Sequence, residues 1–195
     1  AEYACAFKPN SAFFEAFGAD GISALREVIL NIPDGIPVIL DAKRGDIAST
    51  AQAYARSIFE YFGVDAVTYS PYLGSDSIMP FVERPELGVF VLCKTSNSGS
   101  NDLQRLKSNG EYLYVHVARQ AQNWSQYNNL GLVVGATDPQ ALRIVREVAP
   151  NLWFLCPGVG TQGGDLSGAM HAGLREDGMG ILINVSRSIS SSADP

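Results

Sequence analysis

Residues 37–47 read Pro-Val-Ile-Leu-Asp-Ala-Lys-Arg-Gly-Asp-Ile. The apolar residues at the start do not alternate with polar ones, which is typical of a parallel strand covered on both faces. Charged residues follow directly, and the apolar and aromatic side chains of residues 47–62 then predict a helix. A buried strand, a charged loop and a helix in this order make one β/α unit.

The same unit recurs along all 195 residues. Strands are expected at Ala4–Pro9, Pro37–Lys43, Ala66–Ser70, Gly88–Lys94, Leu130–Gly135, Leu152–Pro157 and Gly180–Ser186. Helices are expected at Ser11–Phe17, Ile22–Asn31, Ile47–Phe62, Gly74–Val82, Gly110–Trp124, Pro139–Ala149 and Ser167–Gly173. Strands that alternate with helices predict a parallel α/β fold.

Two parallel architectures compete, the closed (β/α)8 TIM barrel and the open doubly wound sheet. We expect the barrel, as a single domain over residues 1–195, with its first strand and last helix missing from this chain. The counted units are one short of eight, and the chain opens directly on a strand. Polar side chains also collect at the carboxyl ends of the strands, where a barrel builds its active site.

Composition narrows the functional classes. Fourteen basic and twenty acidic residues give a net charge of -6, which argues against a nucleic-acid partner. No apolar run is long enough to span a membrane. The three cysteines lie in apolar, strand-like segments, so we expect buried, reduced thiols and a cytoplasmic protein. His116 and His171 stand alone, without the Cys or carboxylate spacing of a metal site, and structural roles are expected for both.

The charged residues after the strand at 37–40 indicate acid–base chemistry. Asp41 and Lys43 are two residues apart on a strand and therefore point to the same face. Asp46 lies in the loop or the first helical turn, so that Lys43 is flanked by two carboxylates, which favour its ammonium form. A carboxylate beside a bound anion also disfavours that anion's charge, and loss of CO2 would relieve the repulsion. The pattern therefore suggests proton transfer to carbon with charge neutralisation, although a solvated strand end with a local ion pair would look the same.

A second segment, residues 157–165, reads Pro-Gly-Val-Gly-Thr-Gln-Gly-Gly-Asp. Gly158, Gly160 and Gly163 fit the dinucleotide-binding pattern, but no acidic residue ends the next strand as that motif requires. A glycine-rich loop followed by Arg187 after the last strand fits the phosphate site of a barrel better.

Together these motifs resemble the orotidine 5'-phosphate decarboxylase family. The matching motifs are Phe7-Lys8-Pro9-Asn10, Asp41-Ala42-Lys43-Arg44-Gly45-Asp46-Ile47, Lys94-Thr95-Ser96-Asn97, residues 157–165 and Ser186-Arg187-Ser188-Ile189. They span the whole chain in the expected order. The resemblance implies decarboxylation of orotidine 5'-phosphate to UMP, without metal or cofactor. It also implies a homodimer, and a fusion to an orotate phosphoribosyltransferase stays open.

The resemblance further implies a role for each matching residue. Lys8 would contact the ribose, Asp41 would lie beside the departing CO2, Lys43 would protonate C6, and the partner subunit would supply Asp46 with Ile47 and Thr50 nearby. The expected substrate contacts of the remaining residues are the pyrimidine for Ser96, the base pocket for Pro157, and the phosphate for Gln162 and Arg187. One departure is that the ribose-binding Asp of the family's first strand has no counterpart, because no such strand precedes Ala1.

Two other readings stay open. A related phosphosugar barrel, either a keto-gulonate-phosphate decarboxylase or a pentose-phosphate epimerase, would need a metal ion. A non-catalytic nucleotide-binding module would keep the phosphate site, yet binding alone does not require the charges of Lys8, Asp41, Lys43 and Asp46.

Overall fold

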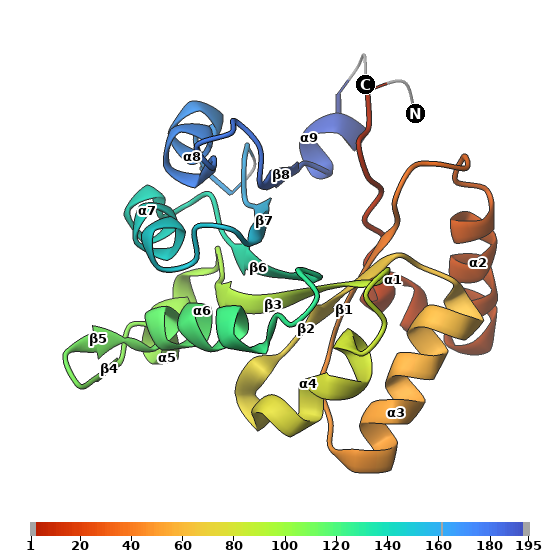
Figure 1. The fold of residues 1–195 in the computed structure, drawn as a ribbon. Helices are drawn as coiled ribbons and strands as arrows, with labels where there is room; N and C mark the ends of the chain where they lie inside the picture. The colour runs from red at the N-terminus through yellow and green to blue at the C-terminus, as the bar shows by residue number, and fades with distance from the viewer. Residues whose placement is uncertain (1–2, 161, 193–195) are drawn as a thin grey trace. The chain divides into compact units, whose positions relative to one another are not determined.

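The computed structural model describes residues 3–160 and 162–192. Its internal contacts divide the chain into two compact units, Ala1–Phe90 and Val91–Pro195. The boundary falls inside strand β3 (Gly88–Lys94), which is labelled in Figure 1. The prediction of one domain over residues 1–195 stays a prediction.

The first unit alternates helices with parallel strands. Its elements are α1 (Ser11–Glu15), α2 (Gly18–Leu30), β1 (Ile39–Arg44), α3 (Ala48–Arg56), the π-helix η1 (Ser57–Phe62), β2 (Ala66–Tyr69), the 3-10 turn η2 (Pro71–Leu73), α4 (Ser75–Val82) and the start of β3. Strand β1 pairs in parallel with β2, with Ile39 opposite Ala66. Helix α3 packs against α4, and the fully buried Val67 and Phe81 belong to the core of this unit.

The predicted strand Ala4–Pro9 is wrong. The segment joins β1 only through two isolated parallel bridges, Phe7 to Val38 and Asn10 to Asp41. Between them Pro9 has no N–H to donate, which interrupts the ladder, although its carbonyl accepts from the Asp41 amide at 2.9 Å. The expectation of three buried thiols is also wrong, because Cys5 in this loosely paired segment is exposed, whereas Cys93 and Cys156 are buried.

The second unit continues the alternation. Its elements are the end of β3, the 3-10 turn η3 (Ser98–Ser100), α5 (Asn101–Gln104), β4 (Lys107–Ser108), β5 (Glu111–Tyr112), α6 (Leu113–Trp124), β6 (Leu130–Val134), α7 (Pro139–Val148), β7 (Trp153–Pro157), α8 (Leu166–Gly173), β8 (Ile181–Asn184) and α9 (Arg187–Ser190). Strands β6, β7 and β8 are parallel neighbours in chain order. Helix α7 packs against α6 and α8, as Figure 1 shows.

Three predicted helices differ clearly from the structure. The helix expected at Ile22–Asn31 begins earlier, at Gly18. The helix expected at Gly110–Trp124 begins only at Leu113, because residues 107–112 form the β4–β5 hairpin. The helix expected at Ile47–Phe62 is α-helical to Arg56 and then widens into η1, a rare π-helix that ends at Gly63 in the left-handed region. The other six predicted strands are present, with ends that move by up to two residues.

Arg146 on α7 connects the elements of the second unit. Its guanidinium donates to carbonyl oxygens at the end of α7, at the start of β7, at the last residue of α8 and just before β8: Ala149, Pro150, Leu152, Gly173 and Gly180. The guanidinium carbon also lies 3.6 Å from the centre of the Phe154 ring. Burial lowers the pKa of Arg146 to about 10. One cation thus donates to carbonyls at the ends of several elements at once.

The order of the strands decides between the two architectures. In the first unit β2 lies between β1 and β3, and in the second unit the order is β3, β6, β7, β8. Neither order reverses, whereas a doubly wound sheet has a reversal at its switch point. The succession is therefore that of the (β/α)8 barrel.

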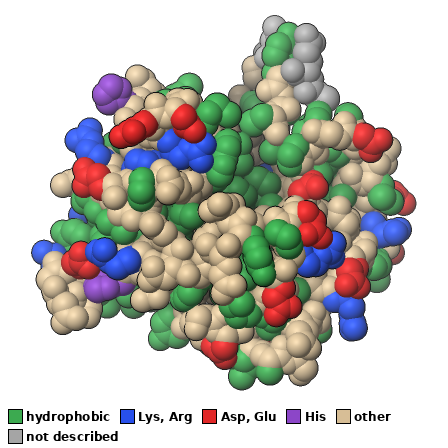
Figure 2. Space-filling model, in the orientation of Figure 1, with side chains coloured by type: hydrophobic (Ala, Val, Ile, Leu, Met, Phe, Trp, Pro, Cys, Tyr) green, Lys and Arg blue, Asp and Glu red, His purple; other side chains and the backbone are tan. Residues whose placement is uncertain are grey.

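The face of the molecule drawn in Figure 2 is mixed in charge. On this face, basic side chains lie interspersed with acidic ones. The ion pairs Arg84–Glu86, Arg119–Glu111 and Arg175–Asp177 are local examples of this mixing. Within residues 3–160 and 162–192, no helix has both the length and the apolar character that a membrane span requires.

Candidate active site

Three charged side chains meet at the carboxyl end of β1. Lys8 Nζ lies 2.7 Å from Asp41 Oδ2, and Lys43 Nζ lies 2.6 Å from Asp41 Oδ1. The side chain of Asp41 is 12% exposed and that of Lys8 14%, while that of Lys43 is 47% exposed. The carboxylate is therefore enclosed between two ammonium groups, and only Lys43 is open to a molecule arriving from outside.

A bulge in β1 brings Lys43 to this position. Leu40 pairs with Val67 while Arg44 pairs with Tyr69, so β1 has extra residues in this stretch. Lys43 takes a φ of +47° within the bulge, in the left-handed region that side chains rarely adopt. Asp41 and Lys43 thus meet because the backbone is irregular, and not through the regular alternation of a strand. Backbone strain such as that at Lys43 is often found at functional sites.

Two polar residues to which the sequence analysis gave no role, Thr68 and Asn10, contact this cluster. Thr68 Oγ1 donates to Asp41 Oδ1 at 3.0 Å and accepts from the Lys43 amide at 2.9 Å. Asn10 Nδ2 lies 3.5 Å from Asp41 Oδ2. One signal was available for Thr68, because it is a polar residue in the otherwise apolar strand β2, where it is 1% exposed.

The electrostatics favour an ionised Asp41. Burial raises the pKa of this carboxyl group, but the charges and hydrogen bonds of Lys8 and Lys43 outweigh it and hold the pKa below its usual range. Asp41 is therefore a fixed negative charge at neutral pH. A second carboxylate placed beside it would be repelled, while Lys43 stands ready as a proton donor.

Asp46 does not join this cluster within the chain. Its Oδ1 accepts from the Ile47 amide at 2.8 Å, and in the part of the chain that the structure describes it forms no ion pair. Gly45 lies in the turn between the end of β1 and Asp46. A Cβ at Gly45 would approach the Ser70 carbonyl oxygen to 2.9 Å. Ile47 is 54% exposed, and Thr50 on the first turn of α3 is exposed as well. Ile47 and Thr50 are thus open to solvent, whereas Asp46 is half-buried.

In the second unit, two predicted substrate contacts come together. Ser96, which follows β3, donates from Oγ to Gln162 Oε1 at 2.9 Å. Small residues leave room for this approach, because a Cβ at Gly135 would meet Ser96 at 2.8 Å and a Cβ at Gly158 would meet Gln162 at 3.0 Å. Pro157 ends β7, and its carbonyl accepts from the Ala136 amide at 2.8 Å.

The glycine-rich loop after β7 is a tight backbone turn. Gly158, Gly160 and Gly163 have φ of +104°, +78° and +85°, values that glycine adopts readily. The Gly164 amide donates to the Gly158 carbonyl at 2.9 Å and closes the loop. Thr161 of the quoted motif lies outside the described residues. Arg187 begins α9 with an exposed side chain, which makes no hydrogen bond or ion pair to the other described residues.

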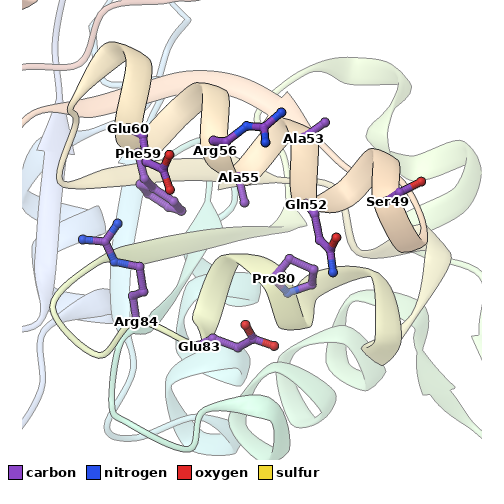
Figure 3. Close-up of a pocket in the computed structure, with 10 residues that line it drawn as sticks. All are labelled: Ser49, Gln52, Ala53, Ala55, Arg56, Phe59, Glu60, Pro80, Glu83 and Arg84. Atoms are coloured by element: carbon purple, nitrogen blue, oxygen red, sulfur yellow. The ribbon is translucent and has the colours of Figure 1, made fainter.

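A separate groove opens elsewhere in the first unit. It has a volume of about 520 Å³ and lies between α3 with η1 on one side and α4 on the other (Figure 3). Arg56 and Glu60 line it from one side, and Glu83 and Arg84 from the other. None of the predicted site residues lines this groove. We therefore take the ends of the strands, where the charged residues gather, as the candidate active site.

Parallel β/α units without a reversal of strand order, and charged side chains gathered at the carboxyl end of a strand, are typical of (β/α)-barrel enzymes. The chain belongs to the orotidine 5'-phosphate decarboxylase / HUMPS family, whose model matches residues 1–195.

Similar proteins agree with this assignment. An orotidine 5'-phosphate decarboxylase of Roseiflexus castenholzii is 54% identical over 187 residues, which cover 95% of this chain and 68% of that relative. The solved OMP decarboxylase of Leishmania donovani is 59% identical with a TM-score of 0.95, over 100% of this chain and 76% of that one. The solved UMP synthase of the same organism is 61% identical with a TM-score of 0.98, and this chain covers 44% of it.

Proposed function

We propose that this chain is a carboxy-lyase that decarboxylates orotidine 5'-phosphate to UMP and CO2, the last step of UMP biosynthesis, with Lys43 as the proton donor. The observation that carries the proposal is the enclosed Asp41 carboxylate between Lys8 and Lys43. The relatives named orotidine 5'-phosphate decarboxylase, at about half identity over most of the chain, support the substrate.

The reaction needs one bond broken and one proton delivered. The bond between C6 and the substrate carboxylate breaks, CO2 leaves, and the electron pair stays on C6. Lys43 Nζ then gives a proton to C6 and is reprotonated from water. Asp41, ionised beside the substrate carboxylate, raises the energy of the bound anion more than that of the transition state, in which the charge has left the carboxylate. Lys8 forms an ion pair with the second oxygen of Asp41. Its remaining N–H groups can donate to the hydroxyls of the ribose.

The substrate contacts in the second unit follow from chemistry that each residue offers. The hydroxyl of Ser96 suits the polar edge of a pyrimidine, and Pro157 offers an apolar wall for the ring. Gln162 and Arg187, with the amides of the glycine-rich loop, suit a phosphate dianion. The guanidinium of Arg187, which is exposed and makes no hydrogen bond or ion pair to the other described residues, supports this assignment.

The proposal includes a homodimer in which Asp46, Ile47 and Thr50 reach the partner's site. Support comes from the first unit, where Asp46 leaves the Lys8–Asp41–Lys43 cluster without its fourth charge. Exposed apolar side chains also follow β1 and β2, namely Ile47, Tyr72 at 90% exposure and Leu73. Such exposed apolar groups at neighbouring strand ends suit a second copy of the chain.

Location and fusion are part of the same proposal. Three free thiols suit the reducing cytoplasm. The likeness to the Leishmania donovani UMP synthase, of which this chain covers 44%, supports a fusion to an orotate phosphoribosyltransferase.

The direct test is to incubate the protein with orotidine 5'-phosphate and follow its ultraviolet absorbance. We expect conversion to UMP that is unaffected by EDTA. Turnover that EDTA abolishes would favour a metal-dependent phosphosugar barrel. Tight binding of UMP without turnover would favour the non-catalytic nucleotide-binding module.

A further inference from the structure

One lysine at a strand end is buried and has no part in the proposed chemistry. Lys94 is the last residue of β3 and is 4% exposed, and among the described residues it is the one charged residue in the buried class. Its Nζ donates to Ser100 Oγ at 2.5 Å, and no carboxylate oxygen of the described chain lies within ion-pairing distance. Burial lowers the pKa of Lys94, and the nearby Asp138 opposes that effect while Arg105 adds to it.

A buried ammonium needs a reason, because desolvation makes it costly. Its partner Ser100 ends the 3-10 turn η3 and is itself 5% exposed. The bond therefore pins the turn that follows Ser96 onto the end of β3. Ser96 lies between the two bonded residues in the chain.

Further bonds close the same segment from its other end. The Thr95 amide donates to Gln104 Oε1 at 2.9 Å, and Gln104 Nε2 donates to Thr95 Oγ1 at 2.9 Å. Next to Gln104, Arg105 pairs with Asp138 at 2.7 Å. Residues 95–105 are thus fastened both at Lys94 and at Asp138.

Ser96 is aimed by this fastened segment. Its carbonyl accepts from Thr137 Oγ1 at 3.2 Å, and its hydroxyl points to Gln162. We propose that Lys94 is a positioning residue, which acts through Ser100 to hold residues 95–104 so that Ser96 meets the pyrimidine ring. The inference rests on the proposed function, because it takes Ser96 as the contact to the base.

The test compares two ligands that share the ribose phosphate and differ in the base. Calorimetry measures the affinity of wild type and Lys94→Met for UMP and for ribose 5-phosphate. We expect Lys94→Met to weaken UMP binding by about tenfold, the scale of one hydrogen bond, and to leave ribose 5-phosphate binding unchanged. If a folded Lys94→Met protein binds both ligands equally more weakly, or binds both as wild type does, the proposal is overturned.

Three further variants complete the experiment. Ser100→Ala removes the partner of Lys94 with little change in volume and gives the same selective loss, so the proposal stays testable even where Lys94→Met does not fold. Lys107→Met, an exposed lysine on the β4–β5 hairpin, is the matched control and leaves both affinities unchanged.

Ser96→Ala separates the positioning role of Lys94 from the proposed contact between Ser96 and the base. If it reduces UMP binding while Lys94→Met and Ser100→Ala do not, the positioning role fails. If it changes nothing, the assignment of Ser96 to the base fails, and the positioning role fails with it.

Discussion

At the scale of single residues, the decisive feature is that a different lysine holds each oxygen of Asp41. The ion pairs to Lys8 and Lys43 are both shorter than 3 Å, and Thr68 adds a hydrogen bond to one of the same oxygens. The carboxylate therefore cannot turn away from a bound anion without losing an ion pair. Preorganised charge of this kind does not have to reorganise when the reaction occurs.

Replacement of Lys43 tests the proton donor. Lys43→Ala should lower kcat by at least about a hundredfold, about 2.7 kcal/mol of barrier, while the dissociation constant of UMP changes little. Steady-state kinetics and calorimetry measure the two quantities, with Lys107→Ala as the control. A kcat within about threefold of wild type, roughly 0.7 kcal/mol, would contradict the assignment.

Asp41 also makes stability depend on pH. Because its pKa in the folded state lies below the unfolded value, the folded state binds fewer protons, and the stability that Asp41 contributes is present above the unfolded pKa. That contribution is lost as the pH falls through the folded pKa. Urea unfolding at about pH 6 and about pH 3 should therefore show a smaller drop in unfolding free energy for Asp41→Asn than for wild type. An equal drop in both proteins would show that the ion pairs do not depress this pKa.

At the scale of elements, the β4–β5 hairpin shows how local sequence sets local structure. Asn109 and Gly110 form its turn with φ of +52° and +85°, the pair of positive values that a type I′ hairpin turn requires. His116 on α6 lies with Nε2 2.9 Å from the Ser108 carbonyl oxygen and ties the hairpin to the helix. The structural role expected for His116 agrees with this contact.

The turn can be tested by substitution at Gly110. Nothing lies within 4 Å of the Cβ that a side chain would add, so the cost of Gly110→Ala comes from the backbone alone, about 1 kcal/mol of unfolding free energy. Gly110→Asn should cost less, because Asn tolerates the left-handed region better. Urea unfolding compares the two variants, and an Ala variant as stable as wild type would refute the turn assignment.

The sequence predicts the elements with long apolar patterns and misses those that depend on exceptions. Strands such as β3 are continuous apolar runs, and the structure has them where expected. The Asn109-Gly110 signal was present but lay inside a longer helical pattern. The bulge at Lys43 and the π-turns of η1 have no such signal in the local sequence. Both lie where the chain meets another element: β1 pairs with β2, and Phe59 of η1 lies edge-to-face with Phe81 of α4. The side chains of Asp41 and Lys43 do meet, as their spacing predicted, but by way of the bulge.

At the scale of the whole molecule, the question is whether one chain suffices for catalysis. The described residues place three of the four expected charges together and leave Asp46 apart. If a second copy supplies the fourth, then activity belongs to the dimer and should fall with dilution below its dissociation constant.

Subunit mixing tests this directly. Lys43→Ala and Asp46→Ala should each be inactive alone, and mixtures that exchange subunits should regain activity. In a mixed dimer with Asp46 acting in trans, one site carries both substitutions and the other carries neither. If Asp46 acts within its own chain, every site keeps one substitution, and the mixture stays inactive even after demonstrated exchange.

The uneven burial of the thiols provides the means to demonstrate that exchange. Cys93 and Cys156 are buried, and burial raises the pKa of both, that of Cys156 to about 12, so neither forms a reactive thiolate at neutral pH. Cys5 alone is exposed. A maleimide dye should therefore attach once per native chain without any engineered cysteine. Donor-labelled and acceptor-labelled pools would then report subunit exchange by energy transfer, in the same tube in which activity returns.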